Sequence, residues 1–237
     1  MIKRLKQVIR KHYLLIGAIS MAWAMYESTK VSRVSLYLPL SPFVWTLSLL
    51  FELFVTGTLV WACVWVGLNG LGYSQINIIK GKFKVLVLAG LVTILPHLLF
   101  TFIPLDWWKG SISDLRNTGL FTWQALVVYL FPLLILTPYT IKYALKENFK
   151  MVLRTSPFIV GMVLIRLFYS KLTFGYLLKN HLYFGSYDSF HRLAMVFTFG
   201  KTLLGVVFYV AATCLMIKLM EEAYPEDMKA CREELAS

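Results

Sequence analysis

The sequence is short of charge. Only 15% of its 237 residues are charged and 58% are hydrophobic, whereas a soluble domain is about one quarter charged and about half apolar. Mean hydropathy is correspondingly high, at +0.67. A water-soluble fold could not bury that much apolar surface, so the composition excludes an ordinary soluble domain.

Acidic residues are scarcer than basic ones, with 12 Asp and Glu against 24 Lys and Arg and a formal charge of +12. An excess of this size could indicate nucleic-acid binding, but the basic residues lie between apolar runs, where they would meet lipid phosphates. We therefore expect a lipid bilayer with anionic headgroups on the cytoplasmic side as the partner, and no nucleic acid.

Cysteine is rare too. Cys63, Cys214 and Cys231 are odd in number and follow no recognised spacing, so they predict neither a disulfide framework nor a zinc site. The sequence also lacks a phosphate-binding loop, a nucleophile elbow and a zinc-protease helix. We expect no metal and no cofactor, and an enzyme is disfavoured because His181, Asp188 and His191 match no metal or catalytic signature.

Long apolar runs are abundant. A helix needs roughly 20 apolar residues to cross a hydrocarbon layer about 30 Å thick, and continuously apolar runs favour helices over barrel strands. The sequence predicts an all-α, polytopic transmembrane helix bundle. It has about six spans, at 13–33, 44–68, 85–105, 120–139, 151–169 and 193–220. Residues 1–220 would form one transmembrane domain, and 221–237 a short acidic cytoplasmic tail.

The first run allows a second interpretation, because Ala22-Trp23-Ala24 resembles a signal-peptide cleavage site. We favour a span there. With the N-terminus in the cytoplasm, fifteen Lys and Arg residues lie on the cytoplasmic side and seven on the other. The positive-inside rule therefore predicts that both termini are cytoplasmic, and the short connections favour a bacterial cytoplasmic (inner) membrane.

Ionisable residues within the apolar runs are the candidates for function. A charge at that depth costs at least a few kcal/mol unless it is paired or hydrated. The spans place four such groups at comparable depth: Glu52, His97, Arg166 and Lys201. This intramembrane polar layer could be a proton or solute pathway, or it could consist of structural ion pairs and snorkelling side chains.

A basic stripe recurs every four residues after the fourth span and into the start of the fifth: Lys142, Lys146, Lys150 and Arg154. Apolar residues at Ile141, Leu145, Phe149 and Val152 would line another side of the same helix. This pattern predicts an amphipathic juxtamembrane helix. A soluble partner is an alternative, but anionic lipid headgroups are the simpler ligand beside a membrane.

The sequence favours a small-solute or ion transporter or channel built around the polar layer. Six short helices enclose little volume, so a homo-oligomer or other membrane subunits would be needed to complete a pathway. The alternative is a non-catalytic assembly or accessory subunit of a larger membrane complex, in which the same charges would pair with helices of other subunits.

Overall fold

The computed structural model describes residues 2–37, 42–73, 87–93, 95–96, 111–137, 140–180, 187–226 and 228–229. These residues contain helices and no strand, which confirms the all-α class. The helices are α1 (Ile2–Tyr37), α2 (Pro42–Gly70), α4 (Ser111–Leu126), α5 (Leu130–Leu136), α6 (Ile141–Arg154), α7 (Ser156–Asn180) and α8 (Tyr187–Ala223). Residues 87–93 and 95–96 are also helical.

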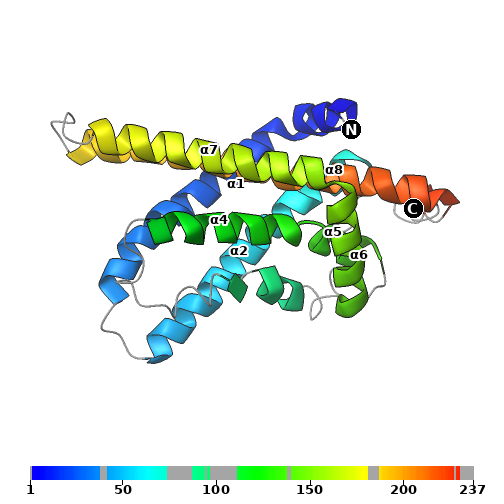
Figure 1. The fold of residues 1–237 in the computed structure, drawn as a ribbon, viewed down its shortest axis with the longest axis horizontal. Coiled ribbons are helices and arrows are strands. Elements are labelled where there is room, and N and C mark those ends of the chain that lie inside the picture. The colour runs from blue at the N-terminus through cyan, green and yellow to red at the C-terminus, as the bar shows by residue number, and fades with distance from the viewer. Residues whose placement is uncertain are drawn as a thin grey trace.

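The helices extend between two ends of the molecule (Figure 1). Helices α4, α7 and α8 run in similar directions, and α1 and α2 cross them. The two chain termini and α6 lie at one end, on the right of the view, and α6 runs crosswise to α7. The C-terminal ends of α1 and α7 lie at the other end.

Three of the described helices are long and apolar enough to cross a membrane, fewer than the six predicted. They are Thr118–Leu136, Ser156–Thr173 and Met195–Ala223, with mean hydropathies of 1.9, 1.2 and 2.2, while Phe54–Gly70 is apolar but shorter. In α1, the basic residues between Lys3 and Lys11 precede the apolar stretch and the carboxylate of Glu27 follows it. These charges lower the mean hydropathy of α1. The third predicted span, 85–105, lies mostly outside the described residues.

Helices α1, α2 and α8 pack together most extensively. Their contact is lined by buried aliphatic, aromatic and small residues. Trp23 of α1 stacks on Tyr209 of α8, with 6.3 Å between ring centroids. The Thr202 hydroxyl of α8 donates a hydrogen bond to the Ser20 carbonyl of α1, at 2.9 Å. This bond satisfies a buried hydroxyl inside an apolar contact, where an unpaired one would be costly.

Two glycines of α2 allow the closest approach of its neighbours. A Cβ at Gly67 would lie 2.9 Å from Thr213 Cβ of α8, and one at Gly70 would lie 2.7 Å from both methyl groups of Val8 in α1. Both neighbours are β-branched and therefore stiff about χ1. The absence of a side chain at these positions consequently sets how closely the three helices pack.

The predicted fourth span is broken. Helix α4 ends at Leu126, a turn covers 127–129, and α5 begins at Leu130. Pro132 explains the break, because proline has no N–H to donate four residues back and its ring clashes with that carbonyl. The break leaves the Tyr129 N–H and the Leu126 carbonyl without their helical partners.

Asn148 of α6 satisfies both groups. Its Oδ1 accepts a hydrogen bond from Tyr129 N at 3.0 Å, and its Nδ2 donates one to Leu126 O at 2.6 Å. The Asn148 side chain is fully buried. A second link joins the Tyr129 hydroxyl to Thr155 Oγ1, 2.8 Å away, where α6 gives way to α7. These bonds hold α6 against the break.

Chain segments far apart in sequence meet at the end that carries the termini. Arg4 Nη1 forms an ion pair with Glu221 Oε2 at 2.5 Å. The Tyr73 hydroxyl donates a hydrogen bond to the other oxygen of the same carboxylate, at 3.1 Å. Glu221 therefore connects the first turns of α1, the segment after α2 and the last turns of α8.

Adding a methyl group at the glycine contacts should destabilise the protein. We expect Gly67→Ala and Gly70→Ala each to lower the free energy of unfolding by about 1–3 kcal/mol, the usual cost of overpacking. Gly57→Ala is the matched control in α2, since its Cβ would meet no atom within 4 Å; it should be neutral or slightly stabilising. Equal unfolding midpoints in detergent for all three variants would contradict the packing.

Removing the amide that fills the helix break should also destabilise the protein. We expect Asn148→Leu to cost about 1–3 kcal/mol for each of the two backbone groups that it leaves unpaired. Lys146→Leu, at an exposed position of α6, is the control and should change the unfolding midpoint little. An Asn148→Leu protein as stable as the wild type would show that the break needs no side-chain partner.

Candidate functional site

Arg166 is a buried cation in the middle of an apolar helix. It lies in α7 and is 8% exposed. Its Nη1 donates a hydrogen bond to Gln124 Oε1 of α4 at 3.1 Å. The guanidinium carbon lies 4.2 Å from the centre of the Phe121 ring, one turn earlier in α4. Hydrogen bonding and cation–π attraction both lower the cost of burying this charge.

Lys201 of α8 approaches the same aromatic ring. Its Nζ lies 5.7 Å from the centre of Phe121. Arg166 and Lys201, 35 positions apart in the sequence, therefore converge from α7 and α8 on α4. The cations repel each other, so the electron-rich ring that they share partly offsets this cost.

Further polar groups surround Arg166. Glu27 of α1 and Tyr209 of α8 are its electrostatic neighbours. Within the described part of the chain, Arg166 Nε is buried and has no hydrogen-bond partner. The guanidinium thus retains an N–H donor for one more acceptor, which could be a water molecule or a bound solute.

The polar layer predicted from the sequence is described only in part. Arg166 and Lys201 meet around Phe121. Glu52 lies in α2, but its side chain is not among those described, and His97 lies outside the described residues. Whether these two groups join the layer stays a prediction.

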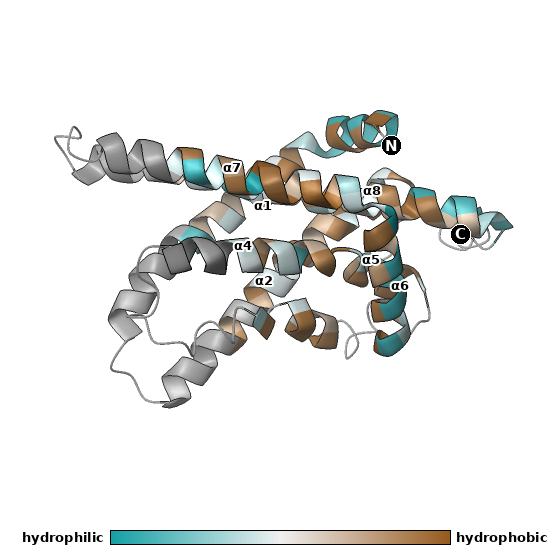
Figure 2. Ribbon diagram, viewed as in Figure 1, coloured by the Kyte–Doolittle hydropathy of each residue, from teal (hydrophilic) through white to brown (hydrophobic). Residues whose placement is uncertain are grey.

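The basic stripe occupies the exposed side of α6. Lys142, Lys146, Lys150 and Arg154 are all exposed, whereas Ala144, Asn148 and Val152 are buried on the opposite side. Hydrophilic colour accordingly covers much of α6 and the two chain ends (Figure 2). A hydrogen bond from Lys150 Nζ to Glu147 Oε1, 2.6 Å long, raises the pKa of Lys150, so this side chain is charged at neutral pH.

Exposed residues of α6 also include apolar ones. Phe149 is 40% exposed and Leu153 is 75% exposed, close to Lys142 and Lys146 on the helix surface. Phe149 was predicted to line the apolar side; it lies instead at the edge of the basic face. A helix with exposed aromatic and aliphatic groups beside lysines is suited to the boundary between headgroups and acyl chains.

No family model, curated relative or solved structure matches the chain. Among the described residues, no cluster of three His, Cys, Asp or Glu side chains could hold a metal ion.

Two of the residues around Arg166 carry a signal in the sequence. Gln124 is a strongly polar residue inside the apolar run Thr118–Leu136, and such residues usually face another polar group. Glu27 similarly lies inside the predicted first span. The position of Phe121 could not have been predicted, because its role depends on how α4 packs against α7 and α8.

The hydrogen bond between Gln124 and Arg166 should contribute to stability. We expect Gln124→Leu, which removes the acceptor but keeps the volume, to lower the free energy of unfolding by about 1–3 kcal/mol, since the acceptor serves a buried charge. Thr122→Val, at an exposed position of α4, is the control. Unchanged thermal unfolding of Gln124→Leu in detergent would show that Arg166 does not rely on this amide.

Proposed function

We propose that the protein is a multi-pass integral membrane protein that passes a small solute or an ion through a polar layer containing Arg166 and Lys201. The main support for this proposal is that these two cations, one from α7 and one from α8, converge on Phe121 of α4. Helices α7 and α8 each contain a stretch that is long and apolar enough to span a membrane, and α4 belongs to a third such stretch, which continues through the break into α5. Charges kept at such positions usually line a path or pair with each other.

The chemistry of the layer fits a binding step in transport. Arg166 is held by one amide and one ring and keeps a buried N–H without a partner in the described residues. In a medium of low dielectric constant, such a donor attracts a polar or anionic group more strongly than it would in water. Glu52 and His97 are proposed as further members of the layer, where they would accept and release protons.

Six spans, cytoplasmic termini and a bacterial inner membrane are part of this proposal. The two termini and α6 lie at the same end of the molecule (Figure 1), which is the alternation that six spans require. The exposed stripe of α6 would bind anionic headgroups of the cytoplasmic leaflet at about 1 kcal/mol per basic residue. A homo-oligomer would enclose the pathway.

A second candidate is an accessory subunit of a membrane complex, and the exposed surface of α7 is the feature that a partner subunit would contact. Only 6% of the apolar stretch Ser156–Thr173 is buried. Large side chains extend along this helix with half or more of their surface exposed: Val160, Leu164, Ile165, Phe168 and Leu172. Lipid tails or a helix of another subunit would cover this face equally well.

A flux assay tests the transport proposal. The purified protein is reconstituted into liposomes, and fluorescent indicators follow the permeability to protons, chloride and potassium. We expect the wild type to raise at least one permeability above that of empty liposomes. Lys201→Gln and Glu52→Gln should lower it at least several-fold, because each removes a charge from the proposed path.

The control is Lys142→Gln, which changes an exposed lysine of α6 outside the proposed polar layer. It should leave the flux unchanged. Each variant must insert to the same extent as the wild type, measured by flotation of the liposomes. Extraction in a mild detergent adds an independent test. Wild-type fluxes no higher than those of empty liposomes, together with stoichiometric partner proteins after extraction, would replace transport by the subunit proposal.

A further inference from the structure

The first three turns of α1 form a separate amphipathic segment. His12 has non-helical backbone angles, φ −123° and ψ 23°, which divide α1 into residues 2–11 and the longer helix that follows. On the inner side of this segment, Val8 is fully buried, and Leu5 and Ile9 pack against the same core. The inner side is therefore fixed to the bundle, and the outer side is left for another ligand.

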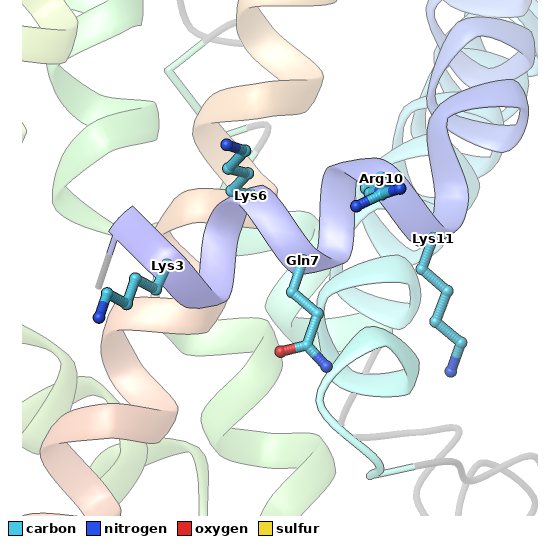
Figure 3. Close-up of a pocket in the computed structure, with 5 residues that line it drawn as sticks. All are labelled: Lys3, Lys6, Gln7, Arg10 and Lys11. Atoms are coloured by element: carbon cyan, nitrogen blue, oxygen red, sulfur yellow. The ribbon is translucent and has the colours of Figure 1, made fainter.

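The outer side of the segment is strongly basic. It contains a shallow hollow of about 460 Å³, lined by Lys3, Lys6, Gln7, Arg10 and Lys11. In Figure 3, Arg10 lies between Gln7 and Lys11 along the segment, and Lys6 extends to the opposite side from Gln7 and Lys11. All five side chains are exposed. Four cations and one amide thus line a surface that supplies only hydrogen-bond donors and one amide oxygen.

The described residues provide no acidic partner for this surface. Within that part of the chain, no ion pair involves Lys3, Lys6, Arg10 or Lys11. Arg4, which lies toward the bundle, is the member of the segment that pairs with Glu221. Like charges one turn apart on a helix repel each other, so an external anion would stabilise this arrangement.

The position of the segment identifies the anion. Tyr13 and Leu14 follow Lys11 and His12 and are 63% and 73% exposed, so large hydrophobic side chains face outward within one turn of Lys11. The segment runs across the direction of α8 (Figure 3), as α6 runs across that of α7 (Figure 1). A helix that changes from basic to exposed apolar residues within one turn fits the boundary between headgroups and acyl chains.

Both basic helices lie at the same end of the molecule. The Arg4–Glu221 pair ties the α1 segment to the end of α8. Lys150 of α6 has Tyr224, just after α8, as an electrostatic neighbour. The basic face of α1 and that of α6 therefore flank the C-terminal end of α8, where one leaflet would contact them together.

We propose that the outer face of residues 2–11 binds the phosphate headgroups of anionic phospholipids. It would form a second lipid-binding surface, in addition to that of α6, and the two would engage the same leaflet. The phosphates would accept hydrogen bonds from Arg10 and from the lysine ammonium groups, as charge-assisted bonds in a partly desolvated setting. This proposal does not depend on what the polar layer transports.

The test measures phosphatidylglycerol bound to the full-length protein. Wild type and variants are reconstituted in nanodiscs of phosphatidylcholine with or without phosphatidylglycerol, and the lipid retained after extraction in mild detergent is quantified by mass spectrometry. The α1 variant combines Lys3→Gln, Lys6→Gln, Arg10→Gln and Lys11→Gln. We expect it to retain at least twofold less phosphatidylglycerol than the wild type, while retained phosphatidylcholine stays the same.

Two controls make the result specific. Lys171→Gln changes an exposed lysine of α7, which begins at the α6 end and runs toward the opposite one, and should leave lipid retention unchanged. A second fourfold variant, with glutamine at the basic positions of α6, should lose a separate part of the bound lipid. The unfolding midpoint in pure phosphatidylcholine shows whether each variant is folded. A folded α1 variant that retains as much phosphatidylglycerol as the wild type would overturn the proposal.

Discussion

The arrangement of α4 to α7 depends on one constraint, which is the pairing of backbone polar groups at the break between α4 and α5. In an apolar medium, an unpaired N–H or carbonyl costs several kcal/mol, and the break between α4 and α5 leaves the Tyr129 N–H and the Leu126 carbonyl without helical partners. One carboxamide, that of Asn148, pairs both. Because Asn148 must reach the break, α6 has to lie against it. This requirement also determines the directions in which the other side chains of α6 face.

The orientation of α6 determines which of its side chains are exposed at the end of the molecule that carries the termini. With Ala144, Asn148 and Val152 turned inward, the helical period turns the lysines outward. The Tyr129–Thr155 hydrogen bond then fixes the corner from which α7 departs, and α7 carries Arg166 to Phe121 and Gln124. The exposed basic stripe and the buried cation layer are thus connected through the contacts of α6 with the break and with the start of α7.

Much of the architecture follows from the sequence because its signals are local. Apolar runs predict helices, and the four-residue spacing of Lys142, Lys146, Lys150 and Arg154 predicts their common face, which is exposed in the structure. Charges in apolar runs identify Arg166 and Lys201. Their meeting at Phe121 and the use of Asn148 at the break depend on contacts between residues 19 to 80 positions apart, and no periodicity records such contacts.

The number of spans is harder to predict from the sequence. A run such as that of α1 has the length of a span but mixes apolar residues with flanking charges, so hydropathy alone does not decide its environment. The position of α1 in the bundle is set by its contacts with α8: Trp23 stacks on Tyr209, and the Ser20 carbonyl accepts a hydrogen bond from Thr202. Packing against other helices compensates for what α1 lacks in apolar character.

That packing has a consequence for biogenesis. The first helix of the chain makes its most extensive contacts with the last one, and Arg4 and Glu221, 217 positions apart, close the pair. During synthesis α1 is made long before α8 exists. The Ser20 carbonyl and the Gly70 contact of Val8 therefore reach their final surroundings at different times, because the contacts of α1 with α8 form only after α8 has been made.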